Sequence, residues 1–195
     1  MMIALIDYGA GNTASVINVL KDLNAEFVLT NDKEIISNAD KIILPGVGEA
    51  SSAMSKLHQL DLISPIKKLT KPFLGICLGM QLLCRKTEEG NADCLNIIPV
   101  DVKKFDSTKS KVPHMGWNSI KNFNDENLFR NFSENSFFYF AHSYYVPENQ
   151  FTTSVCNYVI NFSSSIRYKN FFGVQFHPEK SAEYGIQIIK NFLSL

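Results

Sequence analysis

FLGICLGMQLL, residues 73–83, contains an unbroken apolar run that passes directly into a cysteine and a helical pattern. The run, residues 73–76, has the length of a buried strand, and Leu82 and Leu83 belong to the helical stretch after Cys77. A glycine lies on each side of Cys77, and a turn that crowds the backbone needs small residues of this kind. The stretch therefore predicts a strand, a tight turn at Cys77 and a helix.

Earlier segments repeat this order of strand, loop and helix. Continuous apolar runs at residues 2–6 and 27–29 predict strands, as does the segment 41–44, in which three apolar residues follow Lys41. Apolar residues at helical spacing follow the first and the third. Continuous rather than alternating apolar strands, separated by helices, are typical of a parallel sheet that is covered on both faces. The expected fold class is α/β, with a doubly wound, mostly parallel central sheet and helices on both faces.

The second half of the chain has a different pattern. Short strand candidates with few helices between them lie at residues 97–105, 137–141, 154–160 and 171–176. They predict an antiparallel extension of the sheet, and the apolar spacing of residues 182–193 predicts a final amphipathic helix. Because the chain has 195 residues and a domain has about 150, we expect one domain over residues 1–195.

Charge and composition exclude several classes of protein. Nineteen Lys and Arg residues balance nineteen Asp and Glu residues, so the overall field favours neither nucleic acid nor an anionic membrane surface. We find no basic leader and no apolar run of about 20 residues, the length that spans a bilayer. The four cysteines show no C-x-x-C pair and no histidine at ligand spacing. We expect a cytoplasmic protein with no metal, no cofactor and no disulfide framework.

Cys77 has the sequence environment of a nucleophile. GICLG, residues 75–79, fits the G-x-nucleophile-x-G pattern, in which a strand turns sharply into a helix and presents the nucleophile at its carboxyl end. Unpaired N–H groups and the positive dipole at the helix start favour a thiolate. A buried structural cysteine between packing glycines is the alternative interpretation.

QFHPE, residues 175–179, supplies the groups that would activate such a cysteine. In an extended segment, residues two apart project to the same side, so His177 and Glu179 are expected to lie close together, with Pro178 disfavouring a helix. His177 would act as the base and Glu179 would orient it. A solvated His–Glu pair at a strand end is the alternative.

PGVG, residues 45–48, follows another predicted strand of the same sheet. Glycines at this position leave backbone N–H groups free to face a developing oxyanion, whereas a plain β-turn is the alternative. All three motifs lie at the carboxyl ends of predicted strands, the edge at which α/β sheets bind ligands.

PGVG, GICLGMQ (75–81) and FHPEKS (176–181) together resemble the motifs of the class I (triad) glutamine amidotransferases. DYGAGN (7–12), PHMGWN (113–118) and YFAHSY (139–144) resemble, more narrowly, the glutaminase subunits of imidazole glycerol phosphate synthases, and the similarity runs essentially from end to end.

The resemblance implies hydrolysis of glutamine to glutamate and ammonia, through a γ-glutamyl thioester on Cys77, with His177 and Glu179 completing the triad. It implies oxyanion N–H groups from Val47 and Leu78. The positions that such enzymes use to hold the small-molecule substrate L-glutamine are Gly48, Gln81, Glu89, His142, Ser143 and Tyr144.

The resemblance also implies a partner, a (β/α)₈-barrel cyclase or synthase subunit that forms a heterodimer with the chain and receives the ammonia in histidine biosynthesis. Asn12, Tyr139 and Lys180 stand where the family has residues near the subunit boundary, and Trp117 belongs to its docking loop. A closed boundary is chemically useful because it prevents the loss of ammonia to solvent.

Residues 91–96 depart from the family pattern, with Cys94 in place of a glycine. Three alternative functions stay open. Paralogous glutaminase subunits supply ammonia to sugar-modifying amidotransferases of surface polysaccharide biosynthesis. A non-catalytic regulatory module on the same scaffold would lack a nucleophile or base, and a cysteine peptidase or thiol sensor would use a related α/β sheet.

Overall fold

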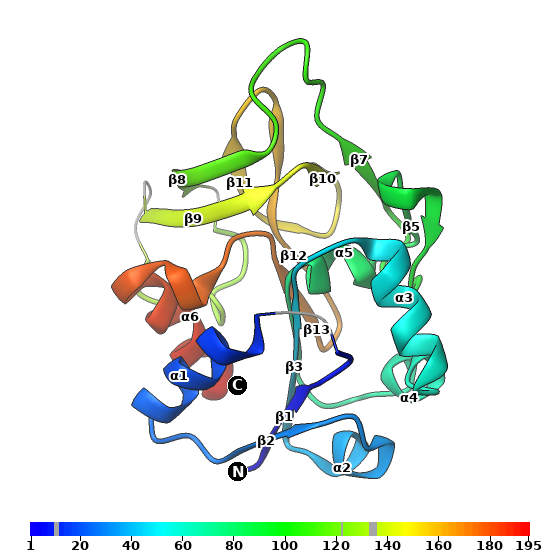
Figure 1. The fold of residues 1–195 in the computed structure, drawn as a ribbon. Helices are drawn as coiled ribbons and strands as arrows, with labels where there is room; N and C mark the ends of the chain where they lie inside the picture. Colours follow the sequence, from blue (N-terminus) through cyan, green and yellow to red (C-terminus); the bar gives the residue numbers. More distant parts are fainter. Residues whose placement is uncertain (10–11, 122, 133–135) are drawn as a thin grey trace.

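The apolar runs predicted as strands form the parallel half of one large sheet (Figure 1). The structure is a computed structural model and describes residues 1–9, 12–121, 123–132 and 136–195. Ala10 and Gly11 of the DYGAGN motif lie outside the described residues. The parallel strands, in spatial order, are β2 (Phe27–Thr30), β1 (Ile3–Ile6), β3 (Lys41–Gly46), β4 (Phe73–Cys77) and β13 (Phe171–Val174).

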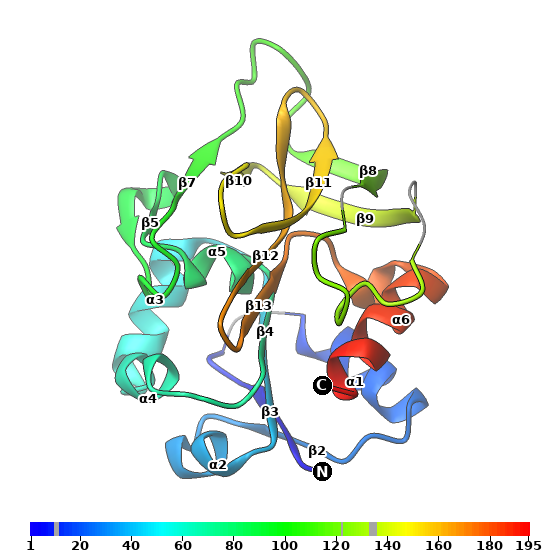
Figure 2. The same ribbon diagram turned by 180° about the vertical axis from the view of Figure 1, so that it is seen from behind.

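Helices cover both faces of this sheet, as the continuous apolar strands predict (Figure 2). Alternate residues of β1 enter opposite cores: Ala4 and Ile6 contribute to one, Ile3 and Leu5 to the other. The helices of the first core are α2 (Lys33–Asn38), α3 (Ala50–Gln59), α4 (Ile63–Lys67) and α5 (Leu78–Leu83). The helices of the second core are α1 (Thr13–Asp22) and α6 (Ala182–Leu193).

The predicted antiparallel extension is confirmed. β13 pairs antiparallel with β12, which leads to β10, β7, β5 and β6, while β11 pairs with β12 and β8, and β8 with β9. The bounds of these strands are β5 (Lys86–Thr87), β6 (Ala92–Asp93), β7 (Asp101–Lys104), β8 (His114–Lys121), β9 (Ser136–His142), β10 (Tyr144–Pro147), β11 (Thr152–Asn157) and β12 (Asn161–Tyr168). Within the described residues, no helix is long and apolar enough to cross a membrane.

Some boundaries differ from the expectations. The candidate at 97–105 is a strand only over β7, and the candidate at 154–160 ends at Asn157. The departure at residues 91–96 contains β6, and Asn91 and Asn96 on either side of it adopt positive φ angles of 48° and 49°, whereas Cys94 does not. Asparagine tolerates the left-handed conformation, so the backbone of this segment places no glycine requirement on residue 94.

Candidate active site

Cys77 lies at the sharp turn that the G-x-C-x-G pattern predicts. It is the last residue of β4, and its φ of 53° and ψ of −106° put the backbone in a region that non-glycine residues rarely adopt. A Cβ at Gly75 would lie 2.5 Å from the carbonyl oxygen of Gly79. The strand and helix approach too closely here for larger residues, so the two glycines make the turn possible.

His177 and Glu179 form a buried pair beside this turn. Nδ1 of His177 lies 2.8 Å from Oε1 of Glu179, and both side chains are almost inaccessible to solvent. The local geometry differs from the expectation, because Pro178 begins a short 3₁₀ turn, η2 (Pro178–Lys180), instead of extending the strand. Proline suits the first position of a helical turn. This turn places the Glu179 carboxylate within hydrogen-bond distance of the His177 ring.

The environment of His177 favours its charged form. Burial opposes the charge, but hydrogen bonds with Cys77 and Glu179 and the negative charges of these groups outweigh it and raise the pKa of His177 from 6.5 to about 10. The imidazole is therefore protonated at neutral pH. A protonated imidazole next to a cysteine stabilises a thiolate, the nucleophilic form of the side chain.

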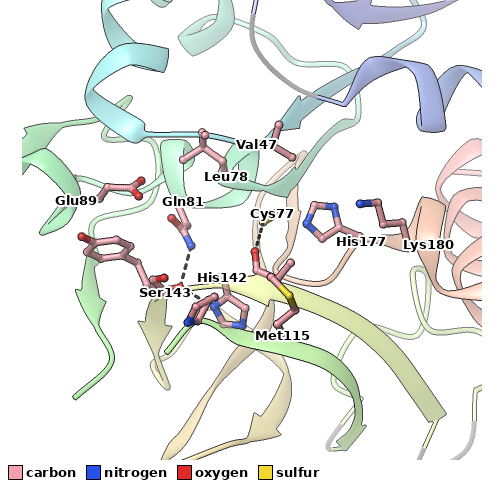
Figure 3. A pocket seen from close by; sticks show the side chains of 14 residues that line it. Val47, Cys77, Leu78, Gln81, Glu89, Met115, His142, Ser143, His177 and Lys180 are labelled. Atoms are coloured by element: carbon pink, nitrogen blue, oxygen red, sulfur yellow. Dashed lines mark hydrogen bonds between the residues drawn. The ribbon is translucent and has the colours of Figure 1, made fainter. Parts of the chain in front are cut away.

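Cys77 and His177 line a cavity of about 350 Å³, with Glu179 bonded to the imidazole. Figure 3 shows Cys77 and His177 at one part of this cavity and Glu89 at the opposite end, with Gln81 between them. Its lining includes the predicted residues Val47, Gly48, Cys77, Leu78, Gln81, Glu89, His142, Ser143, Tyr144, His177 and Lys180. A cavity of this size, with a nucleophile at one end and a carboxylate at the other, matches an amino acid that reacts at its side chain.

Two chain segments frame the position where an oxyanion would form. Gly46 pairs with Cys77 in the β3–β4 register, which places Val47 and Gly48 at the cavity. Leu78 is the first residue of α5, and N–H groups in a first helical turn have no partner within the helix. The buried Tyr8 hydroxyl donates to the carbonyl oxygen of Pro45 at 3.0 Å and so fixes the end of β3.

The far wall of the cavity is held by polar groups. Oε2 of Glu89 accepts from the backbone N–H of Ala50 at 2.9 Å, at the start of α3, and burial raises the pKa of Glu89 more than this bond lowers it. Nδ1 of His142 donates to the carbonyl oxygen of Tyr144 at 2.7 Å, and its Nε2 accepts from Nδ1 of His114 at 3.0 Å. Both ring nitrogens of His142 are thus engaged within the protein.

Three of the predicted boundary residues, Trp117, Tyr139 and Lys180, lie next to one another. Trp117 is exposed on β8, a paired strand rather than a loop, and its ring lies 6.2 Å from that of Tyr139 on β9. Nζ of Lys180 is 5.9 Å from the Tyr139 ring. Asn12 precedes α1, which contacts the η2 turn that carries Lys180, and its Nδ2 donates to Oγ of Ser15.

The predicted nucleophile and base thus line one pocket at the carboxyl ends of β3, β4 and β13, and the predicted carboxylate bonds to the base. The family model of glutamine amidotransferase class-I matches residues 4–195. The chain belongs to the class-I glutamine amidotransferase family. As an amidotransferase of this family, it is an enzyme with glutaminase activity.

Relatives of this amidotransferase are similar over their whole length. The imidazole glycerol phosphate synthase subunit HisH of Bacteroides fragilis strain YCH46 is 52% identical, and that of Salmonella typhimurium strain LT2 is 44% identical, with 100% of both chains covered in each case. The solved structure of PurLQS from Thermotoga maritima matches with a TM-score of 0.72 at 19% identity, over 99% of this chain and 97% of that one. The last similarity concerns the fold alone.

Sequence reasoning assigned no function to three residues of the amidotransferase site: Tyr8, His114 and Gln175. All three are buried polar side chains in quoted motifs, and each is hydrogen-bonded to the site's framework. Their sequence signal is weak, because a polar residue inside a strand-like segment is usually assigned to the solvent face.

The raised pKa of His177 predicts a pH-dependent stability. A group whose folded pKa is above its unfolded value contributes stability that is complete below the unfolded pKa and is lost as pH rises through the folded one. We expect the free energy of unfolding to fall between about pH 6.5 and pH 10 more steeply in the wild type than in Glu179→Gln, which lacks the charge that pairs with the imidazolium. Denaturant titrations across this range test the difference, and equal slopes for the two proteins would contradict it.

Proposed function

We propose that this amidotransferase is the glutaminase subunit of an imidazole glycerol phosphate synthase, a single glutaminase domain over residues 1–195 that acts in the cytoplasm. The observation that carries the proposal is that the Cys77 turn and the buried His177–Glu179 pair meet at one amino-acid-sized cavity, which Cys77 and His177 line. HisH subunits of imidazole glycerol phosphate synthases that are 51–52% identical over the full length support this function.

In the first step, the Cys77 thiolate attacks the side-chain amide carbon of L-glutamine. Negative charge develops on the amide oxygen, where the N–H groups of Val47 and Leu78 stabilise it. Protonated His177 gives its proton to the leaving nitrogen, so ammonia departs and a γ-glutamyl thioester remains on Cys77. Glu179 holds the imidazole in one tautomer and stabilises its charge.

In the second step, water hydrolyses the thioester. Neutral His177 takes a proton from the water as it attacks, and the Cys77 sulfur leaves, which gives glutamate and restores the thiolate–imidazolium pair. Glu89 would hold the α-ammonium group of the substrate, while Gly48, Gln81, His142, Ser143 and Tyr144 form the walls around it. The chemistry needs no cofactor.

The partner would be a (β/α)₈-barrel cyclase subunit that receives the ammonia. Met115, Trp117 and Phe137 are each more than half exposed on β8 and β9, and form an apolar face beside the cavity, which Met115 lines. A contiguous exposed apolar face marks an interaction surface. A partner seated there would close the cavity mouth and retain the ammonia, with Tyr139, Lys180 and Asn12 near the boundary.

Reconstitution with the histidine-pathway cyclase subunit from the same cell tests the function. We expect the mixture to form imidazole glycerol phosphate from glutamine, and Trp117→Ala to weaken association by about 10-fold or more, since aromatic anchors dominate such interfaces. Leu29→Ala is the matched control, because Leu29 is also exposed but lies on β2, at the opposite end of the sheet. Association only with a sugar-modifying synthase would support the paralogous function instead.

A non-catalytic module on this scaffold is less well supported, because Cys77 and His177 line one cavity and Glu179 pairs with His177. Glutamine-dependent ammonia release by the chain and its partner separates the two functions.

A further inference from the structure

Gln175 contacts the Cys77 sulfur through its side-chain amide. Its side chain is fully buried, and its Nε2 is 3.6 Å from Sγ of Cys77. The residue follows the last residue of β13 and precedes His177 by two positions, so one strand end presents both groups to the sulfur.

The orientation of the Gln175 amide is fixed by its neighbours. Nε2 of Gln81 donates to two acceptors, the backbone carbonyl oxygen of Tyr144 and Oε1 of Gln175, both at 2.9 Å. A backbone carbonyl can only accept, so the NH₂ group of Gln81 must face Tyr144 and Gln175. Oε1 of Gln175 therefore faces Gln81, and its NH₂ group faces the sulfur.

We propose that Gln175 is a further catalytic residue, whose side-chain N–H donates to the Cys77 sulfur and stabilises the thiolate that attacks the substrate. The inference rests on the proposed function in taking Cys77 as the nucleophile. A thiol sulfur is a weak acceptor, whereas a hydrogen bond to a charged acceptor is about twice as strong as a neutral one. The amide therefore stabilises the thiolate more than the thiol, and as a non-titrating group it does so at every working pH.

The other groups around the sulfur do not stabilise the thiolate throughout the reaction. The carbonyl oxygen of Ala141 lies 4.0 Å from Sγ, where it accepts from a thiol but repels a thiolate. The titratable groups facing Cys77 are His177, with Glu179 behind it, and the buried Tyr8 hydroxyl, whose pKa is raised by burial and by the charge of Cys77. His177 supplies its proton to the leaving group during the reaction, so Gln175 is the donor that stays in place.

The bond network also connects this donor to the substrate wall. From Gln175 it continues through Gln81 to the Tyr144 carbonyl, then to His142 and to His114 on β8. β8 carries the exposed Trp117, so the donor to the sulfur is held by groups that reach the apolar face described above.

The test measures the thiolate directly and needs no glutamine. The rate of Cys77 alkylation by iodoacetamide is followed from pH 5 to 10 by peptide mass spectrometry, which separates Cys77 from Cys84, Cys94 and Cys156. We expect Gln175→Met, a near-isostere without a donor, to raise the pH midpoint by about one unit or more. Its kcat for glutamine with the partner bound should fall on the order of 10- to 100-fold, the range for a lost hydrogen bond to a charged group.

Gln187→Met on α6 is the matched control, because the Gln187 amide bonds to Asn191 on the same helix, and its midpoint should not move. If Gln175→Met does not fold, Gln175→Asn replaces it, since an amide one methylene shorter no longer reaches the sulfur. An unchanged midpoint in a folded variant would overturn the inference and leave the proposed function standing. Conversely, full glutamine hydrolysis by Cys77→Ala would overturn the proposed function.

Discussion

Replacing Cys77 by alanine is expected to lower glutamine hydrolysis by about 10⁴-fold or more, because no other group in the cavity provides a nucleophile of comparable strength. Ammonia-dependent synthesis by the complex with the partner should survive, since externally added ammonia bypasses the thioester. Both activities are measured on the same preparation, with either glutamine or an ammonium salt as nitrogen donor.

Cys94→Ala is the control for this substitution. Cys94 is half-buried directly after β6, where its backbone N–H donates to the carbonyl oxygen of Arg85 at 2.9 Å, so its loss should leave both activities near wild type. Loss of the ammonia-dependent activity in Cys77→Ala would contradict the division of labour between hydrolysis and synthesis.

Gly79→Ala is expected to destabilise the protein by about 3 kcal/mol or more, at the upper end of the cost of overpacking a core. A Cβ at residue 79 would run into the carbonyl oxygen of Leu44 in β3, a backbone atom that cannot move without shifting the strand. The same strand leads into Val47 and Gly48, so the variant should lose activity as well as stability. Thermal and denaturant unfolding measure the effect.

Ser52→Ala provides the comparison, because Ser52 is exposed on α3 and gives up only a surface hydroxyl. Its free energy of unfolding should stay within about 0.5 kcal/mol of the wild-type value, as is usual for surface substitutions. A Gly79→Ala protein with wild-type stability would show that β3 and α5 do not approach as closely as described.

The sequence predicts the parallel half of the fold well because its signal is local. Residues 73–76 and 42–44 are unbroken apolar runs, and their burial on both faces follows from that pattern alone. Because parallel strands end at the same sheet edge, the motifs that follow them are predicted to meet there. Cys77 and His177 line the same cavity at this edge. The pocket likewise gathers the residues that the family resemblance implies.

Other features depend on contacts distant in sequence and gave no local signal. β12 contains three consecutive serines that resemble a loop, yet they are buried. Hydroxyl groups of Thr152, Thr153 and Ser154 on β11 bond to them across the sheet. The family resemblance implies a docking loop at Trp117. Pairing of β8 with β9 and β11 makes this segment a strand instead. The donor position of Gln175 likewise depends on Gln81, which is 94 residues away.

The most direct test of the triad is to trap the acyl intermediate. The wild-type enzyme with its partner is mixed with labelled glutamine, quenched in acid within one turnover and mapped by mass spectrometry. We predict a glutamyl thioester on Cys77 alone. A label that is absent throughout the time course, or that resides on Cys84, Cys94 or Cys156, would contradict cleavage by the Cys77, His177 and Glu179 pocket.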